Sequence, residues 1–365
     1  MLKNPVGRAW NGRRISFSAR EASTTQRGGG GVVEVRFYGL ITHFERPFLE
    51  VLGSPGRVDI RACAHTVGGV QNATDFNANK WLDDGSFGSW LGQIDSGVAS
   101  NVAAFSRSRH SEGVLLCKGV EVGVVGPTPA GPRAPVSKDN VSERTLLSVA
   151  SLLGRVVGYA PEHEGDVVQN IVPVKQLATE QSSTSSSVTL AFHTEAAFHP
   201  HKPRYLLLLC LRGDPQAATT YALLKDVLSL LPDQARQDLS REEFTTGVDS
   251  SYNPRPGAVS KPHSVLSSGN VPVWCWDEEL TQGITPRARE ALLDLAAAVC
   301  ACSRAVVLEK GDLLILDNNS VVHGRSPFSP RFDGTDRWLQ RSFVVPDLRA
   351  VGDDLSGNVI TTSFS

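Results

Sequence analysis

The sequence predicts a mainly β fold, in which strands roll into a barrel and helices cover its outer face. Short apolar segments of strand length dominate the second half of the chain, and only two helical patterns interrupt them. One of these segments, Tyr205–Leu211, is continuously apolar, which is typical of a strand buried on both faces. The chain shows no internal repeat.

Regular elements are sparse in the first half. Val32–Tyr38 alternates enough to be the first strand, residues 72–109 mix short helical stretches with loops, and Val114–Cys117 reads as a short buried strand. The four prolines that follow this strand exclude regular structure. Apolar residues then recur at helical spacing over Ser142–Leu153, and Gly154 suits the C-terminal cap of that helix.

The second half reads mostly as strands. One helix is predicted over Leu223–Leu231, where Pro232 stops it, and another runs from Thr285, its N-cap, to about Cys300. The Ser-, Pro- and Gly-rich residues 250–270 read as an active-site lid or as a loop without a role. Strands are predicted at Val167–Val174, Val188–His193, Tyr205–Leu211, Val271–Trp276, Leu313–Leu316, Val321–Gly324 and Trp338–Val345.

Composition points to an ordinary globular protein. The 365 residues are 41% apolar and 20% charged, and the net charge of −2 provides no bulk field that recruits nucleic acid or anionic lipid. No apolar run is long enough to span a membrane. The six cysteines include no CxxC pair and read as reduced thiols of a cytoplasmic protein. We therefore expect a small-molecule partner, without nucleic acid or membrane.

Residues 1–31 differ from the rest of the chain. They contain five arginines and one acid, several hydroxyl residues and a terminal run of four glycines, with too little apolar content to pack. We predict a mobile basic N-terminal arm, followed by one catalytic domain over residues 32–365. An Arg- and Ser-rich start also resembles an organelle transit peptide.

Three residues have the spacing of a metal site. His193 and Glu195 are two apart, so on a strand their side chains point to the same face. His323 follows a tight turn, from which a third ligand can reach in from another strand. Two imidazoles and one carboxylate suit Fe(II) and leave positions open for a cosubstrate and O₂. The alternative is that a His-x-Glu triplet arises by chance among nine histidines.

His199 and His201 form a rival pair, also two apart. Pro200 and Pro203 break any strand there, and no carboxylate lies between the two histidines. We interpret them as loop or supporting histidines.

Two arginines follow the distal histidine. Arg337 and Arg341 are four apart, so they share one face of the last predicted strand, and each guanidinium can hold a carboxylate with two hydrogen bonds. One carboxylate would be the distal group of 2-oxoglutarate, and the other would belong to the substrate. The alternative is a pair of surface arginines on an amphipathic strand.

At this point the residues resemble a known family, the clavaminate synthase-like oxygenases. The resemblance covers roughly residues 140–350 and agrees in ligands, spacing and flanks. It rests on Gln169, Pro173, Ser187, Leu190, His193-Thr194-Glu195, Ala197-Phe198-His199-Pro200, Tyr205, Cys210-Leu211-Arg212-Gly213-Asp214, Asp317-Asn318, His323-Gly324-Arg325 and Arg337-Trp338-Leu339-Gln340-Arg341.

The resemblance implies a distorted double-stranded β-helix, which is a jelly-roll or cupin-like core. It also implies Fe(II), 2-oxoglutarate and O₂ as cofactor and cosubstrates, and hydroxylation of a free L-amino acid, mostly at Cβ, in a specialised pathway such as antibiotic biosynthesis. The implied residues are His193, Glu195 and His323 for iron; Arg337 and Thr220, with Thr219 as the alternative, for 2-oxoglutarate; Arg341 for the substrate carboxylate; Glu195, Gln169, Ser183 or Thr184 for its amine; and Asp277 for its side chain.

One departure bears on the substrate. Cys275 and Asp277 are two apart, so we expect them to share one strand face. Cys275 stands where the arginine-hydroxylating members have a second acid beside Asp277, so a lysine-, ornithine-, citrulline- or amide-type side chain fits as well as arginine. Asp277 also reads as a turn-initiating acid. Because Glu195 is present, the resemblance implies hydroxylation rather than chlorination. The alternatives are desaturation or cyclisation in the same family, a zinc hydrolase with the same ligands, and a catalytically silent anion-binding barrel.

Overall fold

The computed structural model describes residues 57–58, 76–83, 85, 87–108, 113–267 and 272–364. The N-terminal arm, the strand expected at Val32–Tyr38 and Cys63 lie outside these residues, so the division at residue 31 stays a prediction.

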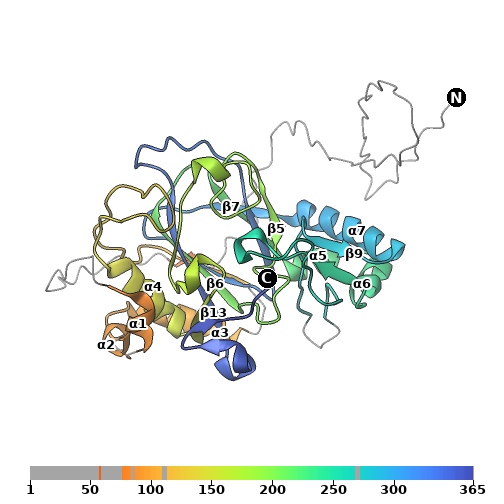
Figure 1. Cartoon of the computed structure of the whole chain (residues 1–365), viewed down its shortest axis with the longest axis horizontal. Coiled ribbons are helices and arrows are strands. Elements are labelled where there is room, and N and C mark those ends of the chain that lie inside the picture. Colours follow the sequence, from red (N-terminus) through yellow and green to blue (C-terminus); the bar gives the residue numbers. More distant parts are fainter. Residues whose placement is uncertain are drawn as a thin grey trace. The chain divides into compact units, whose positions relative to one another are not determined.

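Two β-sheets enclose an apolar core, which confirms the predicted mainly β, jelly-roll-like fold (Figure 1). The larger sheet has the strand order β1-β2-β11-β6-β13-β3-β15-β14, with β4 also paired to β13. The smaller sheet has the order β10-β7-β12-β5. The strands of the larger sheet are β1 (Arg57–Val58), β2 (Val114–Cys117), β3 (Arg155–Tyr159), β4 (Gln169–Ile171), β6 (Tyr205–Arg212), β11 (Leu313–Asp317), β13 (Trp338–Val345), β14 (Leu355–Ser356) and β15 (Val359–Ile360). Those of the smaller sheet are β5 (Leu190–His193), β7 (Ala218–Leu223), β10 (Arg304–Val307) and β12 (Val321–Arg325), and β8 (Phe244–Thr246) pairs with β9 (Thr281–Gly283).

Strand β6 lies at the centre of the larger sheet, between β11 and β13, as its apolar run predicts. Its alternate residues Leu206, Leu208 and Cys210 face the core between the sheets. Leu207 and Leu209 face the opposite side, where helices cover the sheet. Both faces of β6 are therefore buried, which explains why the sequence shows no polar alternation there.

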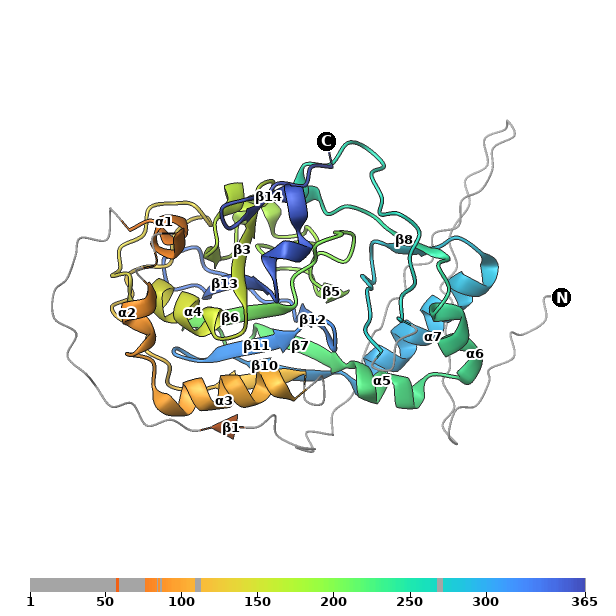
Figure 2. The same ribbon diagram turned by 90° about the horizontal axis from the view of Figure 1, so that it is seen from below.

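Helices cover the outer face of each sheet. Helices α3 and α4 pack on the larger sheet, whereas α5, α6 and α7 pack on the smaller one, near its residues Ala222 and Val322 (Figure 2). Thr285 caps α7 by accepting a hydrogen bond from Ala288, as expected from the sequence. The helices are α1 (Ala78–Asp83), α2 (Phe87–Leu91), α3 (Ser96–Arg107), α4 (Val141–Ser151), α5 (Leu224–Leu230), α6 (Asp233–Leu239) and α7 (Pro286–Cys302).

Some predicted elements are shorter, and one is wrong. The strand expected over Val167–Val174 is limited to β4. The strand expected over Val271–Trp276 is not formed by its described residues, where Trp274 makes only an isolated bridge to Leu266. Trp274 and Trp276 are apolar because they pack among α5, α6 and α7, not because they belong to a sheet. Strands β3, β7 and β10 were not predicted.

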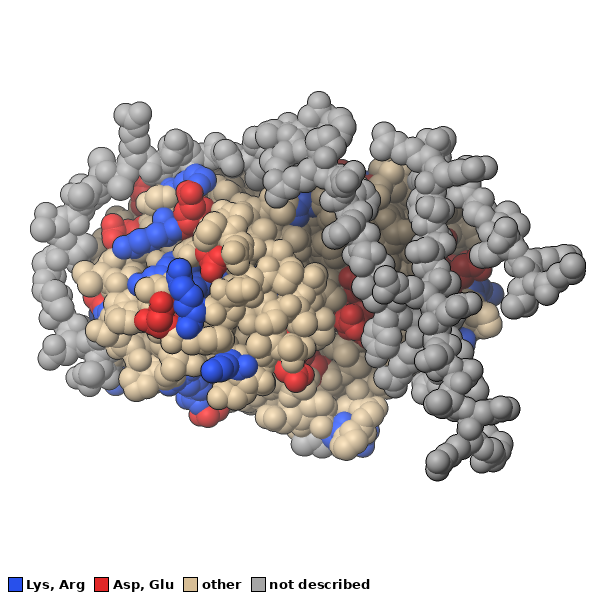
Figure 3. Space-filling model, turned by 90° about the horizontal axis from the view of Figure 1, so that it is seen from above, with Lys and Arg blue, Asp and Glu red and all other residues tan. Residues whose placement is uncertain are grey.

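The described surface is mixed in charge. On the face drawn in Figure 3, basic and acidic side chains are interspersed over the described residues, in line with the small net charge. None of the described helices is long and apolar enough to cross a membrane. The five described cysteines are free thiols, of which Cys117 and Cys210 are buried and Cys300 is exposed.

Candidate metal centre and substrate pocket

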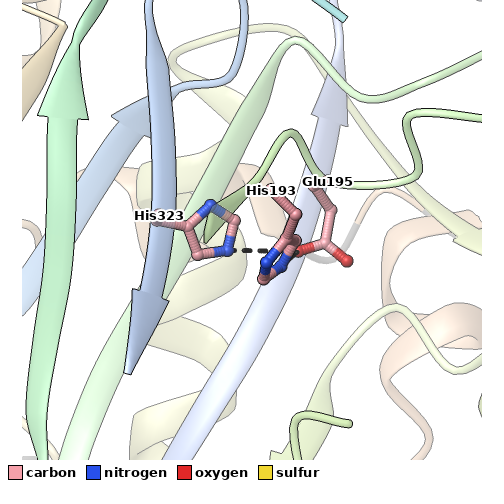
Figure 4. Close-up of side chains that lie close together, drawn as sticks. All are labelled: His193, Glu195 and His323. Atoms are coloured by element: carbon pink, nitrogen blue, oxygen red, sulfur yellow. Dashed lines mark ion pairs between the residues drawn. The ribbon is translucent and has the colours of Figure 1, made fainter. Parts of the chain in front are cut away.

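Three side chains meet between neighbouring strands of the smaller sheet. In the antiparallel pairing of β5 with β12, His323 lies directly opposite His193, and the centres of the two imidazole rings are 4.3 Å apart. Glu195 Oε2 lies 3.5 Å from His323 Nε2 and 4.0 Å from His193 Nε2. Figure 4 shows the three side chains converging, and one ligand atom from each lies within 4.8 Å of the others.

Glu195 reaches this point from a turn rather than from a strand. Strand β5 ends at His193, and Ala196 has a φ of 50°, in the left-handed region. The expected strand alternation therefore does not extend to Glu195. Asn318 holds the turn instead: its Oδ1 accepts from the Glu195 N–H at 2.8 Å, and its Nδ2 donates to the carbonyls of Glu195 and Pro203.

Replacing Asn318 with alanine is expected to destabilise both the fold and the metal centre. The loss leaves the Glu195 N–H and two carbonyls without their partner, and we expect about 2–4 kcal/mol less free energy of unfolding, since each buried group left unpaired costs ~1–3 kcal/mol. Urea unfolding measures this change, with Asn358→Ala as the control, since the Asn358 side chain donates to the exposed Asp83 and to no other described residue. An unchanged urea midpoint would rule out this bracing role.

The electrostatic surroundings of His323 and Glu195 suit a divalent metal. Burial, together with the neighbouring His193, lowers the pKa of His323 to about 4, so its imidazole is neutral near pH 7. Burial alone would raise the pKa of Glu195, but the positive charge of Arg341 and the nearby imidazole groups lower it to about 2. His193 Nδ1 lies 2.9 Å from the carbonyl of Ala191, which leaves Nε2 available as a ligand.

The donor set fits ferrous iron. It offers two imidazole nitrogens and one ionised carboxylate on one side, which is the arrangement of non-haem iron oxygenases. Glu195 Oε2 is buried and has no hydrogen-bond partner among the described residues. A metal ion at this point would coordinate that oxygen.

Arg341 lies beside the metal centre. It is buried, and it pairs with side chains of opposite charge. Its Nη1 donates to Glu195 Oε1 at 3.3 Å, and its Nε donates to Gln169 Oε1 at 2.9 Å. Its Nη2 forms an ion pair with Glu162. Arg341 extends from the inner face of β13, because Leu339 and Phe343 on either side of it belong to the core between the sheets.

Glu162 was missed by the sequence analysis. It is 6% exposed, pairs with Arg341, and accepts a hydrogen bond from the Tyr252 hydroxyl at 3.3 Å. Burial raises the pKa of Glu162, although Arg341 opposes the rise. The only signal in the sequence is a polar run after an apolar segment, Pro161-Glu162-His163-Glu164, which also fits an ordinary turn.

A pocket of about 790 Å³ opens beside the metal centre. Its lining includes the acids Glu162, Glu195 and Asp277, together with Arg341. Ser183 and Thr184, which we expected near the substrate amine, also line it. Gln169 is not among the described residues that line the pocket. It is 2% exposed, and its side-chain oxygen accepts a hydrogen bond from Arg341.

Asp277 serves a turn and faces the pocket at the same time. Its Oδ1 accepts hydrogen bonds from the backbone N–H groups of Glu279 and Leu280, at 2.9 and 2.8 Å. Its Oδ2 makes no hydrogen bond to any described residue. Cys275 is not among the described residues that line the pocket, because its thiol points to the carbonyl oxygen of Ala197, 2.8 Å away. Asp277 and Cys275 therefore do not share one face, as the strand predicted at Val271–Trp276 would require.

Arg337 is a buried cation without a partner. It is 7% exposed and forms no hydrogen bond or ion pair with any residue in the described part of the chain. Burial lowers its pKa to about 10, so it remains charged near pH 7. A buried charge left unpaired is costly, which makes this position suited to an anion.

The strand pairing separates the two candidate threonines. Thr219 lies opposite Arg325 of β12 and Thr220 lies opposite Gly324, so only Thr219 shares a face with His323. Ala222 and Val322, which share the face of Thr220, pack against the outer helices. Thr220 therefore points away from the metal centre. The hydroxyl of Thr219 is buried and lacks a partner among the described residues.

His199 and His201 do not approach the three ligands as a group. His199 Nδ1 accepts the N–H of His201 at 2.9 Å, and its ring packs against Tyr159 and Phe364. His201 Nε2 lies 3.3 Å from a carboxylate oxygen of Asp354. Within the described residues, His193, Glu195 and His323 form the one group of three His, Cys, Asp or Glu side chains close enough together to hold a metal ion.

Comparisons with known proteins agree with this geometry. The L-asparagine oxygenase of Streptomyces coelicolor is 37% identical over 253 residues, covering 68% of this chain and 76% of that protein. The L-lysine 3-hydroxylase of Catenulispora acidiphila is 34% identical over 262 residues, covering 70% of this chain and 73% of the relative. The crystal structure of the non-heme iron oxygenase OrfP, in complex with Fe and alpha-ketoglutaric acid, matches with a TM-score of 0.68 and 30% identity, over 78% of this chain and 91% of OrfP.

A family model covers the region that carries these residues. The model described as taurine catabolism dioxygenase TauD, TfdA family matches residues 134–343, which include β5, β12 and most of β13. This match and the relatives above confirm the predicted resemblance. The chain belongs to the TauD/TfdA dioxygenase family.

Proposed function

We propose that this protein is an Fe(II)- and 2-oxoglutarate-dependent oxygenase that hydroxylates a free L-amino acid with a basic or amide side chain. The observation that carries the proposal is the convergence of His193, Glu195 and His323 beside a pocket whose lining includes Arg341 and several carboxylates. The relatives named for asparagine and lysine, and the OrfP complex with iron and alpha-ketoglutaric acid, support it.

His193, Glu195 and His323 would hold the iron. When bound, iron and 2-oxoglutarate supply, with O₂, the oxidising chemistry that converts a C–H bond to C–OH and yields succinate and CO₂. Arg337 would hold the distal carboxylate of 2-oxoglutarate. Thr219, rather than Thr220, would add a hydroxyl donor, because it is the threonine on the inner face.

The pocket offers a complementary group for each end of an amino acid. The substrate carboxylate would take one edge of the Arg341 guanidinium, and its ammonium group would lie between Glu162 and Glu195. Because Arg341 Nη1 is only 3.3 Å from Glu195 Oε1, this arrangement anchors the α-carbon next to a metal ligand. The adjacent carbons Cβ and Cγ are then the ones nearest to the metal, and Cβ is the favoured site of hydroxylation.

A panel of free amino acids tests the function. The protein is incubated with Fe(II), 2-oxoglutarate and O₂, and products are identified by mass. Gain of one oxygen supports hydroxylation, whereas loss of two hydrogens identifies a desaturase or cyclase of the same family. Hydrolytic activity that persists without O₂ and 2-oxoglutarate would identify the zinc-hydrolase alternative instead.

Replacing Asp277 with asparagine is expected to change which amino acids are accepted. The free Oδ2 of Asp277 would contact the far end of the side chain, and a hydrogen bond to a charged group contributes ~1.5–3 kcal/mol, so kcat/KM for lysine or arginine should fall about 10- to 100-fold relative to asparagine. Glu279→Gln is the matched control, because this pocket residue is exposed. An unchanged ratio of basic to amide substrates would reject the role of Asp277.

A further inference from the structure

Arg325 is a buried cation that the proposed function does not use. It lies on β12, two residues after His323, and is 3% exposed. Its Nη1 donates to the carbonyl of Ser185 at 2.6 Å, and its Nη2 donates to the Ser185 hydroxyl and to the carbonyl of Val188, both at 3.0 Å. It forms no ion pair with any described carboxylate. Among the described residues, its charge is met by these neutral oxygens and by the ring of Phe328, whose centroid lies 5.0 Å from Arg325 Cζ.

The third nitrogen of Arg325 has no hydrogen-bond partner in the described part of the chain. This nitrogen, Nε, is buried, and so is the hydroxyl of Thr219, the residue directly opposite on β7, which also lacks a described partner. Side chains in directly opposite positions of an antiparallel pair are neighbours on one face. Two buried donors that lie side by side would destabilise the fold if no acceptor ever occupied the space between them.

Arg337 completes this group. It is the buried arginine described above, which has no partner among the described residues. The next residue, Trp338, packs on the helix-covered side of the larger sheet, so Arg337 points to the inner side, which Arg325 and Thr219 also face from the smaller sheet. An anion that accepts hydrogen bonds from both arginines, and from Thr219, would satisfy these donors.

The terminal nitrogens of Arg325 contact a segment that borders the substrate pocket. The residues that it holds, Ser185 and Val188, lie in the middle of segment 182–190. The ends of that segment line the pocket, through Ser183 and Thr184 on one side and Leu190 on the other. Arg325 is thus the described side chain that links the unpaired donors to the wall of the substrate pocket.

We propose that Arg325 is a cosubstrate-binding and positioning residue: its Nε joins Arg337 and Thr219 around the distal carboxylate of 2-oxoglutarate, while its terminal nitrogens fix segment 182–190 as a wall of the substrate pocket. The proposal rests on the proposed function. It goes further by making the cosubstrate a condition for a well-ordered substrate pocket.

Arg325→Lys tests the first half, because it keeps the charge and removes Nε. Calorimetric binding of 2-oxoglutarate to the Fe(II)-loaded protein without O₂ is compared with that of 2-oxopentanoate, which has the same carbon chain without the distal carboxylate. We expect 2-oxoglutarate to bind about 10- to 100-fold more weakly, the range for one charge-assisted hydrogen bond, with 2-oxopentanoate unchanged. Arg331→Lys, an exposed arginine between β12 and β13, is the matched control.

The outcomes separate the possibilities. A general loss of folding would weaken both ligands equally, whereas the proposal requires the ratio between them to fall. Equal 2-oxoglutarate binding by Arg325→Lys and wild type would overturn the role of Nε. If the wild type binds neither ligand, the proposed function itself fails.

Hydrogen exchange tests the second half without turnover. Addition of 2-oxoglutarate should slow amide exchange in segment 182–190 of the wild type, because Arg325 becomes fixed at both ends. The same addition should leave this segment unaffected in Arg325→Lys at a concentration that saturates the variant. Equal slowing in both proteins would show that the cosubstrate does not act through Arg325.

Discussion

Glu195→Ala is expected to abolish succinate formation coupled to substrate oxidation. The change removes the one carboxylate among the three converging ligands, whose Oε2 is buried without a partner among the described residues. Loss of residues that merely support metal ligands typically costs about 10- to 100-fold in metal affinity or activity, so loss of a ligand should exceed that range. Bound iron, measured after gel filtration, and succinate formed per product report the two effects separately.

The control for this change is Glu180→Ala, which removes an exposed carboxylate from the same pocket. It should keep both iron and turnover. Arg341 retains Glu162 and Gln169 as partners when Glu195 is removed, so the pocket keeps its principal cation in place. Undiminished coupled turnover by Glu195→Ala would reject the ligand assignment and, with it, the proposed chemistry.

The position of His323 after a turn and the direction of Arg341 were accessible from the sequence because they depend on local geometry. Strand β12 begins directly after the turn at Asp317-Asn318-Asn319, which places His323 at the third residue of a short strand. Strand β13 has the predicted bounds, and its alternation points Arg341 into the core. Such features depend only on period and turn chemistry.

The side chain that pairs with Arg341 was not accessible. Glu162 and Arg341 are 179 residues apart, and nothing periodic marks Glu162 as buried. Gln169 was expected at the substrate amine, but it lies opposite Arg341 in the pairing of β4 with β13 and is used to hold the guanidinium. Neither outcome follows from spacing, because both depend on which strands the fold makes neighbours.

The choice between Thr219 and Thr220 shows how failure to predict one strand leads to the wrong residue in the site. Residues Thr219, Tyr221 and Leu223 alternate as inward positions of β7, but this segment was not predicted as a strand. Without its alternation, two consecutive threonines are equivalent in the sequence. Once β7 is paired with β12, the face of each threonine follows from the position of His323.

Asp277 and Cys275 show the opposite error, a strand predicted where the described residues form none. The expected strand placed both on one face, so that Cys275 appeared to replace an acid that contacts the substrate. The structure turns the Cys275 thiol to a backbone carbonyl, whereas Asp277 lines the pocket. The residue at position 275 therefore gives no basis for inferring the substrate, and under the proposed function the side-chain preference would depend on Asp277.

Arg337→Ala is expected to raise the 2-oxoglutarate requirement steeply while leaving kcat at saturation largely intact. A guanidinium that binds a carboxylate with two charge-assisted hydrogen bonds contributes about 3–4 kcal/mol, so KM for 2-oxoglutarate should rise about 10²- to 10³-fold. This large effect is expected at this position because no described side chain pairs with the Arg337 guanidinium, so the cosubstrate would be its main partner. Steady-state kinetics at fixed amino acid and varied 2-oxoglutarate measures the change, and Arg331→Ala is the exposed control.

Thermal unfolding distinguishes lost binding from lost structure. A ligand present at 100 times its dissociation constant stabilises the native state by about 2.7 kcal/mol, so 2-oxoglutarate should raise the melting temperature of the Fe(II)-loaded wild type. The same concentration should raise that of Arg337→Ala much less, although the variant alone melts cooperatively. If both proteins respond equally, the cosubstrate carboxylate is held elsewhere, and the unpaired charge at Arg337 needs another anion.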